Sequence, residues 1–496
     1  MPQILLVNIP SDSGKKSYDK AFPFSKTINF GLLSIATYLK DKGLDVLIFD
    51  PFSKYYRDYK RGIVSEIQET MPLAIGLSCI SGFNYPPLKS ISILLKKKFP
   101  DIPIITGGKD HVGLIPQEVL LDCGEIDIVI RGEAEIIIYK LMESIINKQP
   151  ISGIPNIVYR DENGNIKETP IVNSLILDTI PSLDYRLYPN YLSFPPSIEV
   201  SRGCPHSCKF CVNTGTKIRK KPVAQIIEDV GVIIQLYKIQ NPCLYFETPI
   251  FSFNNTEIEE LIDLKKGKEV QFTWRTETRV DYLSPDRINR LAKAGLKVID
   301  LGLESGVPEI LARMNKTQNP EKYLKSAAIA LKSAYENDII IKINLLFYIG
   351  ETRKTLIETI KFLEQNQQYV QSVSAYPLIA YPGMIDNVGL QSELESFGGS
   401  IDQSKKWKER HLMAVNPSDE FTYRELDEEI GILIGKSYQS IQTFYNQKIY
   451  GYFPHNVSYS EFETVAKSFG IEKLPFFYNA ADRINAKNSL MRILAG

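Results

Sequence analysis

The chain has 496 residues, of which 44% are hydrophobic and 23% are charged. This composition is typical of a globular protein and argues against a disordered or fibrous one. At roughly 150 residues per domain, the length predicts about three folding units. Lysine plus arginine and aspartate plus glutamate both number 58, so no net charge attracts nucleic acid or an anionic membrane. We expect no nucleic-acid partner.

The amino-terminal apolar run has no basic stretch before it and no small-residue cleavage site. We therefore expect a strand there and not a signal peptide. The apolar run at 339–349 is interrupted by Lys342 and Asn344 and is shorter than the roughly 20 residues that span a bilayer. The expectation is a cytoplasmic protein without a membrane span.

Residues 1–150 alternate short β-branched runs with amphipathic helical stretches. In the first helix, Leu32, Ile35, Ala36 and Leu39 fall on one face. The alternation predicts an α/β domain with a doubly wound parallel sheet. Its strands are expected at residues 4–8, 45–50, 73–79, 102–106 and 127–131.

The carboxyl ends of these strands form a candidate crevice, because ligands of doubly wound sheets bind there. The residues at these ends are small, flexible or polar: Ser78, Ser81, Gly82, Thr106, Gly107, Gly108, Arg131, Gly132 and Glu133. The alternative is that the glycines only form tight turns, and spacing alone does not separate the two. No Gly-x-Gly-x-x-Gly sequence follows the first strand, which argues against a dinucleotide.

A hairpin and a linker are predicted at 151–195. Residues 153–171 have the pattern of two strands joined by a turn at 161–165. The proline-rich stretch 180–196 marks the main domain boundary.

Residues 196–388 alternate strand and helix again, with strands expected at 197–201, 243–246, 272–276, 298–303, 340–347 and 372–377. Six such units predict a partial (β/α)6 barrel, with its chemistry at the carboxyl ends of the strands. Residues 389–496 are expected to be mainly helical, with the clearest helix at 425–445. Their aromatic side chains are expected to cap the barrel, to line a substrate pocket or simply to form a core: Tyr438, Phe444, Tyr445, Tyr450, Tyr452 and Phe453.

Three of the six cysteines, Cys204, Cys208 and Cys211, crowd into eight positions on one loop. Such clustering indicates a metal rather than a disulfide framework. Three thiolates can hold a 4Fe-4S cluster and leave one iron open to a ligand. Structural zinc is the alternative and would need a fourth ligand, for which His206 is the nearest candidate. The other cysteines are isolated and are expected to be structural: Cys79, Cys123 and Cys243.

The Cys-x3-Cys-x2-Cys sequence, with Phe210 before its last cysteine, resembles the signature of the radical S-adenosylmethionine (SAM) superfamily. The resemblance implies that the open iron binds the amino and carboxylate groups of SAM. An electron from the cluster would then cleave SAM to methionine and a 5'-deoxyadenosyl radical. An external electron donor, such as flavodoxin or ferredoxin, is also implied.

Segments at the strand ends resemble those with which the family binds SAM. Residues 301–306 match the Gly-x-Glu-Ser-Gly segment, and residues 274–279 match the third-strand segment. A surface salt bridge is the alternative for any one charged residue. The SAM contacts that the resemblance implies are Phe210, Glu277, Arg279, Glu304, Ser305 and Asn344.

Two departures from the family pattern concern the same site. After the second strand the chain has Tyr-Phe-Glu-Thr-Pro in place of an acidic pair, which leaves Glu247 as the one acidic candidate there. The turn at 348–352 lacks the proline expected after the fifth strand.

The first domain resembles the cobalamin-binding domain that precedes the barrel in cobalamin-dependent radical SAM enzymes. The loop at 23–31, the glycines at 107–108 and the segment 131–135 carry this likeness, and with the barrel it covers about residues 1–385. It implies that cobalamin is held by the strand-end residues named above. The Asp-x-His-x-x-Gly motif of other cobalamin proteins is absent, because the string at 109–113 has the wrong spacing. His111 is therefore expected to be an ordinary loop residue.

The resemblance implies a reaction at an unactivated carbon of a small-molecule or peptide substrate. The expected reaction is C-methylation with methylcobalamin and a 5'-deoxyadenosyl radical in the biosynthesis of a natural product. A radical rearrangement, oxidation or cyclisation without methyl donation is the first alternative. A non-catalytic cobalamin or redox sensor is the second.

Overall fold

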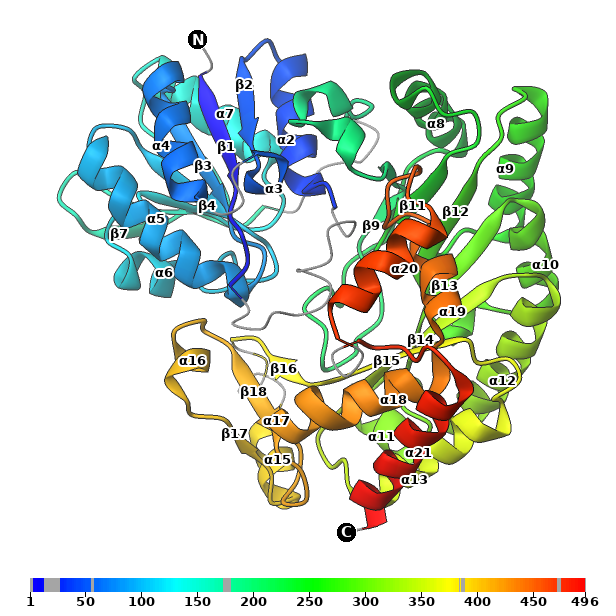
Figure 1. Cartoon of the computed structure of the whole chain (residues 1–496). Helices are drawn as coiled ribbons and strands as arrows, with labels where there is room; N and C mark the ends of the chain where they lie inside the picture. Colours follow the sequence, from blue (N-terminus) through cyan, green and yellow to red (C-terminus); the bar gives the residue numbers. More distant parts are fainter. Residues whose placement is uncertain are drawn as a thin grey trace. The chain divides into compact units, whose positions relative to one another are not determined.

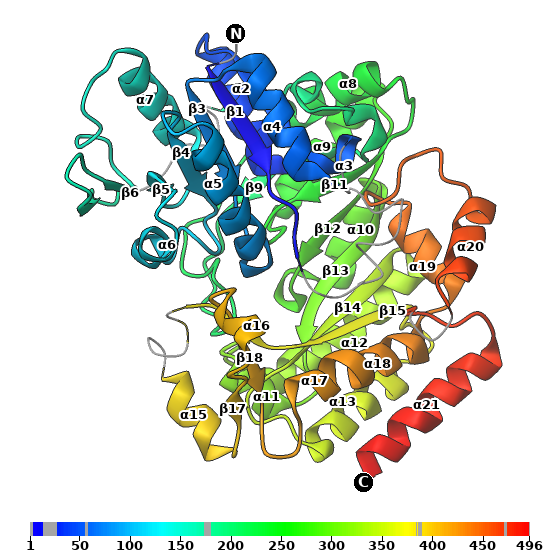
Figure 2. The ribbon, with the colours of Figure 1, turned by 60° about the vertical axis from the view of Figure 1, so that its left-hand side comes forward.

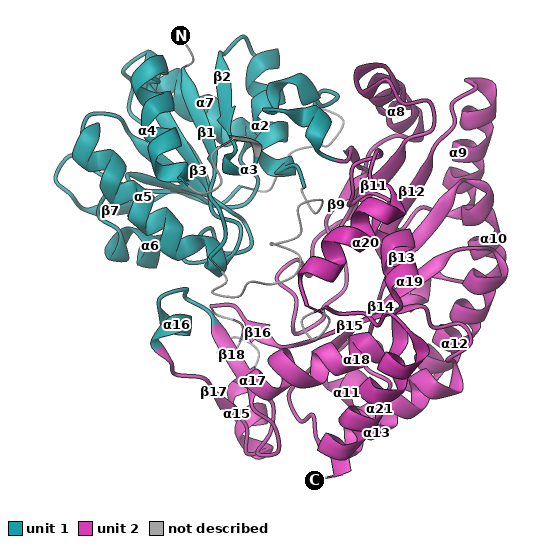
Figure 3. Ribbon diagram, in the orientation of Figure 1, with its two compact units in different colours: residues 1–17, 26–194, 405–412 teal, residues 18–25, 195–404, 413–496 magenta. Residues whose placement is uncertain are grey.

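The structure is a computed structural model that describes residues 3–12, 27–54, 58–172, 180–382, 384, 389–470 and 474–495. It contains two compact units (Figure 3). The first comprises the described residues up to Phe194 together with Lys405–Leu412, and the second comprises the other described residues from Pro195 onward. In the described part of the chain, no helix is both long enough and apolar enough to cross a membrane.

The first unit is built on a seven-stranded sheet with the order β2-β1-β3-β4-β5-β6-β7 (Figure 1). Strands β1 to β5 are parallel to one another. Their side chains are buried almost throughout, as expected when helices cover both faces of a parallel sheet. The strands are β1 (Ile4–Asn8), β2 (Val46–Phe49), β3 (Ala74–Ser78), β4 (Ile104–Gly107), β5 (Ile128–Ile130), β6 (Ile157–Arg160) and β7 (Ile166–Glu168).

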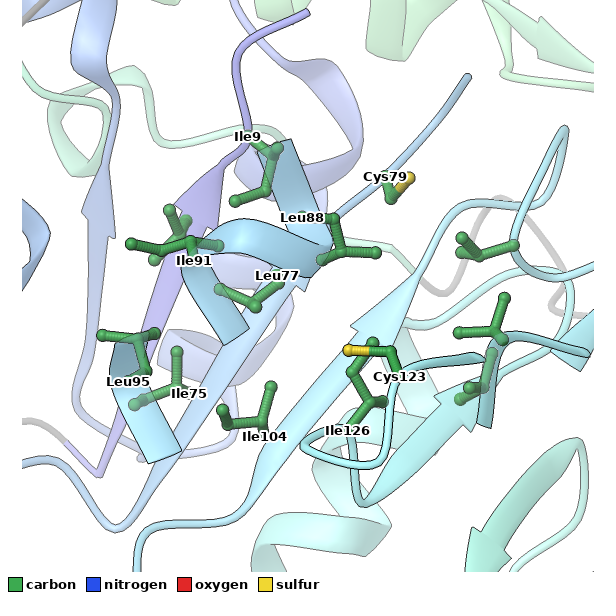
Figure 4. Close-up of a cluster of buried hydrophobic side chains, with 14 of the residues drawn as sticks. Ile9, Ile75, Leu77, Cys79, Leu88, Ile91, Leu95, Ile104, Cys123 and Ile126 are labelled. Carbon is green, nitrogen blue, oxygen red and sulfur yellow. The ribbon is translucent and has the colours of Figure 1, made fainter. Parts of the chain in front are cut away.

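Helices connect these strands and bury their apolar faces on the sheet. In the first helix Leu32, Ala36 and Leu39 are buried as predicted, whereas Ile35 is half-buried. One core cluster of the unit includes Leu77, Cys79, Leu88 and Cys123 (Figure 4). The helices are α2 (Phe30–Asp41), α3 (Pro51–Lys54), α4 (Tyr59–Thr70), η1 (Gly82–Asn84), α5 (Tyr85–Lys98), α6 (Pro116–Asp122), α7 (Glu135–Ile146), η3 (Tyr185–Leu187) and η4 (Tyr191–Ser193).

The predicted hairpin is present as β6 and β7, with Asp161 accepting hydrogen bonds from the turn residues Asn163 and Asn165. It does not stand apart from the first sheet. Strand β6 pairs antiparallel with β5, so the hairpin adds two strands to the sheet edge. The division between the two compact units falls after Phe194, inside the proline-rich stretch.

The second unit contains a six-stranded parallel sheet with the order β8-β11-β12-β13-β14-β15. This confirms the predicted fold class. The strands lie side by side with connecting helices on one face (Figure 2). They are β8 (Ser197–Glu199), β11 (Cys243–Glu247), β12 (Thr273–Thr278), β13 (Leu296–Glu304), β14 (Ile340–Phe347) and β15 (Ser372–Pro377). The helices are α8 (Val223–Tyr237), α9 (Asn255–Gly267), η5 (Val280–Tyr282), α10 (Pro285–Lys293), α11 (Pro308–Arg313), α12 (Pro320–Glu336) and α13 (Arg353–Gln365).

The helix predicted at 425–445 is broken, which corrects that expectation. Gln439 is extended, and Ser440 caps a new helix by accepting a hydrogen bond from the amide of Thr443. The side chain of Gln439 bonds Ser372 and the carbonyl of Pro475, so tertiary contacts hold the break. The carboxyl-terminal elements are β16 (Ile379–Ala380), α15 (Leu390–Ser396), β17 (Ser400–Ile401), α16 (Lys405–Lys408), β18 (Met413–Asn416), α17 (Tyr423–Glu425), η6 (Leu426–Ile430), α18 (Gly431–Tyr438), α19 (Ile441–Lys448), α20 (Tyr459–Ser468) and α21 (Ala480–Ala495).

Candidate active site

The three clustered cysteines lie on a loop whose two ends are paired. Strand β9 (Ser201–Arg202) pairs antiparallel with β10 (Arg219–Lys220) and closes the loop between them. Inside it, the amide of Cys204 donates to the hydroxyl of Thr216, and the amide of Thr216 donates to the carbonyl of Cys204. The loop follows directly after β8, at the carboxyl end of the barrel's first strand.

Two of the thiols receive hydrogen bonds from nitrogen donors. Arg279 Nη1 lies 3.1 Å from Cys208 Sγ, and the amide of Asn213 lies 3.4 Å from Cys211 Sγ. Burial raises the pKa of the Cys208 thiol, and the nearby cations Lys316 and Arg279 oppose that shift. Three cysteine sulfurs on one loop are a donor set that fits an iron-sulfur cluster. Among the described residues, no group of three or more His, Cys, Asp or Glu side chains has an arrangement that could hold a metal ion. The assignment of the cluster to Cys204, Cys208 and Cys211 therefore belongs to the proposal below.

His206, the candidate fourth ligand of a zinc site, lies beside Tyr282. Its Nε2 is 3.2 Å from the Tyr282 hydroxyl, and the two rings meet edge to face. This contact gives the imidazole a partner on η5, outside the cysteine loop.

A second group of SAM candidates lies next to the cysteine loop. Arg279, at the end of β12, also donates to the carbonyl of Lys316. Lys316 Nζ lies 2.8 Å from Glu304 Oε1 and 5.7 Å from the centre of the Phe210 ring. The structure thus brings together Phe210, Arg279 and Glu304, three of the predicted SAM contacts.

Glu304 has a left-handed backbone, with φ of 71° at the end of β13. Such a conformation costs a non-glycine residue of order 1–3 kcal/mol and is concentrated at functional sites. The pairing of β13 with β14 shifts between Gly302 and Glu304. This irregularity turns the carboxylate toward Lys316.

Ser305 lies apart from that group. It is 1% exposed, its hydroxyl accepts a hydrogen bond from the amide of Val307, and it lies 3.4 Å from Thr359 Oγ1. The hydroxyl therefore helps to start α11.

Acidic residues form a row across the concave face of the barrel sheet. Glu199 pairs in register with Glu247, and Glu277 pairs with Asp300, which in turn pairs with Lys342. Paired residues of neighbouring strands point to the same face. On β14 the opposite face is buried beneath helix α12, so the row faces the barrel interior.

The end members of this row are neutralised. Arg202 donates two hydrogen bonds to the carboxylate of Glu199. Asp300 forms ion pairs with Arg275 and Lys342. Although burial alone would raise it, Arg275 and Lys342 hold the pKa of Asp300 below its usual value.

Glu247 and Glu277, in the middle of the row, have no ion-pair partner among the described basic residues. Burial raises the pKa of Glu247 to about 7, against the hydrogen bond from Ser197. Burial, together with Asp300 and Glu247, raises the pKa of Glu277 to about 8. These two carboxyls can therefore hold or release a proton near neutral pH. Asn344 lies one step further toward the carboxyl end of β14, in register with Gly302.

The amino-terminal half of the barrel interior is filled by the carboxyl-terminal region. Arg275 is fully buried, and its Nη1 donates to the carbonyls of Gln447 and Tyr450. The Tyr452 ring lies 4.3 Å from the guanidinium carbon. Of the aromatic residues in question, Tyr452 reaches the barrel residue Arg275 and also packs against the core cluster that contains Phe444 and Phe453.

Sequence reasoning missed Lys316, Arg275 and Asp300 as parts of this site. Arg275 and Asp300 sit within strands, where buried charges are rare unless paired. Charges inside otherwise apolar strand patterns were the signal that could have found them. Lys316 follows α11 in a polar stretch and had no such signal.

The strand-end residues predicted for cobalamin separate into two groups. Thr106 bonds the carbonyl of Leu77, and Arg131 pairs with Glu168 and bonds the carbonyl of Thr169. These two side chains are engaged by the sheet itself. The remaining residues include the half-buried Ser78 and Glu133, and Gly107 and Gly132, at which a ligand can approach the backbone.

Gly107 and Gly108 differ in what surrounds them. An added Cβ at Gly107 would have only an ordinary contact, at 3.7 Å from Ile130. At Gly108 it would lie 1.9 Å from the carbonyl oxygen of Cys79. Gly108 is therefore required by the close approach of two loops, while Gly107 leaves room for a ligand, which fits a large planar cofactor at this edge.

A polar cluster at the same edge was not predicted. Asn29, the N-cap of α2, donates to Asn8 Oδ1 at 2.9 Å and to the Ser78 hydroxyl at 3.1 Å. The backbone amide of Asn29 donates a hydrogen bond to the hydroxyl of Tyr188, and this hydroxyl donates one to the carboxylate of Asp50. These five residues come from five separate segments, so no local sequence pattern indicated the cluster.

Isolated Cys79 and Cys123 are fully buried, as expected of structural cysteines, and burial raises the pKa of each thiol. Cys243 is half-buried and accepts a hydrogen bond from Thr273.

Two family models match the chain. The radical SAM superfamily model matches residues 198–363, and the B12-binding domain model matches residues 24–141. The barrel and its cysteine loop therefore belong to a radical SAM enzyme. With the B12-binding domain ahead of the barrel, the chain belongs to the cobalamin-dependent radical SAM enzymes, whose cofactors are a 4Fe-4S cluster, SAM and cobalamin. The predicted family and cofactors are confirmed.

Among curated relatives, an uncharacterized methyltransferase of Pyrococcus horikoshii is 24% identical over 394 residues, covering 77% of this chain and 81% of the relative. The anaerobic magnesium-protoporphyrin IX monomethyl ester cyclase of Synechocystis is 24% identical over 329 residues. The match covers 63% of this chain and 63% of the cyclase, less than two thirds of its length.

Solved structures resemble the fold. The radical SAM methyltransferase TsrM of Kitasatospora setae, with cobalamin and a 4Fe-4S cluster bound, has a TM-score of 0.66 at 17% identity, covering 82% of this chain and 81% of TsrM. The cobalamin-dependent SAM radical enzyme OxsB has a TM-score of 0.70 at 16% identity, covering 99% of this chain and 75% of OxsB.

Proposed function

We propose that the chain is a C-methyltransferase that acts at an unactivated carbon of a small-molecule or peptide substrate in the biosynthesis of a natural product. The observation that carries the proposal is the contact of Arg279 with Cys208 beside Glu304, at the carboxyl end of a barrel whose interior presents Glu247 and Glu277. The methyltransferase of Pyrococcus horikoshii and TsrM support methyl transfer as the reaction.

The residue roles follow from the contacts. Cys204, Cys208 and Cys211 would hold the cluster, with Arg279 donating a hydrogen bond to Cys208 Sγ. Glu304, kept in place by Lys316, would bind the polar groups of SAM. When bound, the cluster supplies the electron that cleaves SAM, and cobalamin supplies the methyl group.

The carboxyls of Glu247 and Glu277 would bind SAM or substrate groups deeper in the barrel, with Asn344 beside them. Their raised pKa values leave them able to accept or donate a proton near pH 7. In the first unit, Ser78, Gly107, Gly132 and Glu133 would line the corrin. We further propose a cytoplasmic enzyme reduced by flavodoxin or ferredoxin.

The test uses protein purified and reconstituted without oxygen, with cobalamin, a reductant and SAM that carries a deuterated methyl group. Mass spectrometry then follows the label on cobalamin and the formation of 5'-deoxyadenosine. Label on cobalamin together with 5'-deoxyadenosine supports methyl transfer. Neither product would overturn the proposal and favour a non-catalytic sensor.

A radical cyclisation or rearrangement is the second candidate, because the Synechocystis cyclase matches 63% of the chain at the same 24% identity as the Pyrococcus horikoshii methyltransferase. In that case 5'-deoxyadenosine forms but cobalamin acquires no label. The same experiment therefore separates the two reactions.

A further inference from the structure

A short segment from the carboxyl-terminal half of the chain belongs to the first unit. Residues Lys405–Leu412, including helix α16, cluster with the B12-binding domain and are coloured with it in Figure 3. The segment lies between β17 and β18, which pair antiparallel, so it forms the tip of a long hairpin. We call Lys405–Leu412 the strap.

The strap is packed tightly against the loop that follows β3. Trp407 is 3% exposed, and its ring meets that of Phe83 edge to face at 6.0 Å. At Gly82 an added Cβ would lie 2.4 Å from Leu412 Cγ and 2.5 Å from the carbonyl oxygen of Arg410. Only glycine allows this approach, so the loop after β3 is shaped to receive the strap.

The strap also contacts the loops after β1 and β4. His111, in the loop after β4, is fully buried, and its Nε2 lies 2.8 Å from the carbonyl oxygen of Arg410. Arg410 Nη2 donates to the carbonyl of Asp12, after β1, at 2.9 Å. The amide of Asp12 in turn donates to the carbonyl of Phe83. The strap therefore joins three loops that were separate along the chain.

His111 has a defined proton position in this arrangement. Burial lowers its pKa to about 4, so the imidazole is neutral at pH 7. Because a carbonyl oxygen only accepts, Nε2 carries the hydrogen and donates it to Arg410. His111 therefore holds the strap through this hydrogen bond, and the contact explains why its side chain is buried.

Strands β1, β3 and β4 are neighbours in the sheet, and their carboxyl ends are where a doubly wound sheet binds its ligand. We propose that the strap Lys405–Leu412 is a positioning element of the cobalamin site, which holds the loops after β1, β3 and β4 in the conformation that receives the corrin. The proposal rests on the cobalamin-binding role of the first unit. A preorganised site binds its ligand more tightly, because no free energy is lost in ordering the loops when the ligand binds.

The test compares full-length variants with reconstituted clusters, titrated without oxygen with hydroxocobalamin. Trp407→Ala should raise the Kd about tenfold, which corresponds to about 1.4 kcal/mol. Trp407→Phe, which keeps an aromatic ring against Phe83, should stay within about threefold of the wild type. Lys405→Ala is the matched control, because that strap side chain is 86% exposed and should leave the Kd unchanged. Iron content should be equal in all variants.

The electron paramagnetic resonance spectrum of bound cob(II)alamin is the second readout. A loosened crevice should broaden it in Trp407→Ala and leave it unchanged in Trp407→Phe. Wild-type affinity and an unchanged spectrum in Trp407→Ala would overturn the proposal. A wild-type protein that binds no cobalamin would instead overturn the cofactor role of the first unit, so the two failures are distinguishable.

A pair of smaller changes covers the case in which Trp407→Ala does not fold. Gly82→Ala should weaken cobalamin binding, since its Cβ displaces the strap. Leu412→Ala removes one of the two groups in its way, so Gly82→Ala/Leu412→Ala should recover part of the lost affinity. Wild-type cobalamin affinity in a folded Gly82→Ala protein would overturn the role of the strap.

Discussion

Arg279 Nη1 donates a hydrogen bond to Cys208 Sγ across 3.1 Å. The same guanidinium pairs with Asp281 and bonds the carbonyl of Lys316. One side chain at the end of β12 therefore joins the cysteine loop to the segment after α11. A cation beside a sulfur favours the thiolate, and hydrogen bonds to cluster sulfurs tune the reduction potential.

Cys208→Ala should abolish cluster binding, because a two-cysteine loop cannot hold three corners of a cubane. We expect iron content to fall to near background and 5'-deoxyadenosine formation to fall by roughly 100-fold or more. Cys123→Ala is the control. This buried cysteine lies in the first unit, so the variant protein should keep its full iron content. Equal iron in the two variants would contradict the assignment of the cluster.

Glu304→Ala should weaken use of SAM and also destabilise the protein. Lys316 is only 4% exposed, so its amine would lose its carboxylate partner, at a cost of about 3 kcal/mol. Glu304→Ala/Lys316→Met should recover stability but not SAM use, measured as kcat/KM for 5'-deoxyadenosine formation. Recovery of both would show that Glu304 serves only to neutralise Lys316.

Gly107→Val should raise the Kd for cobalamin at least about tenfold without altering iron content, because the position has room that the corrin would use. Gly108→Ala is expected to act differently. Its Cβ would overlap the carbonyl of Cys79, so thermal unfolding of the first unit should shift downward as well. Normal cobalamin binding by a folded Gly107→Val protein would remove Gly107 from the site.

Glu277→Gln should stabilise the protein at alkaline pH. The pKa of Glu277 is raised from its ordinary value of 4.5 to about 8, so the folded protein keeps a proton that the unfolded chain releases. Stability from this group is fully present below about pH 4.5 and is lost as the pH rises through about 8. Glutamine removes that loss, so the Tm of the variant should exceed the wild-type Tm by several degrees at pH 8.5 and match it near pH 5. A difference that does not change with pH would contradict the raised pKa.

Local sequence patterns predicted the strands and the cysteine loop well, because both depend on residues close together in the chain. The strands of both sheets fall within a few residues of the predicted ranges, since β-branched runs bounded by turns define them. The cysteine spacing likewise needs no distant partner. These features carry most of the fold and the centre of the candidate site.

Contacts between distant residues were not predicted. His111 and Arg410 are 299 positions apart, and Arg275 and Gln447 are 172 apart. Neither pair has a local sequence pattern. The contacts of the strap, and the filling of the amino-terminal half of the barrel interior, are therefore visible only in the folded structure. The broken helix at Gln439 has the same origin, since its side chain is satisfied by Ser372 and Pro475 rather than by neighbours in sequence.

The ties of Arg275 and His111 to late segments bear on the order in which the protein matures during synthesis. A ribosome that has completed the barrel strands has yet to make Gln447 and Tyr450, so the guanidinium of Arg275 still lacks two of its acceptors. The B12-binding domain likewise waits for Arg410. Domains usually fold in turn as they emerge. Here neither domain can complete these contacts until Arg410 and Tyr450 have been synthesised, so each finishes folding well after its own last strand has been made.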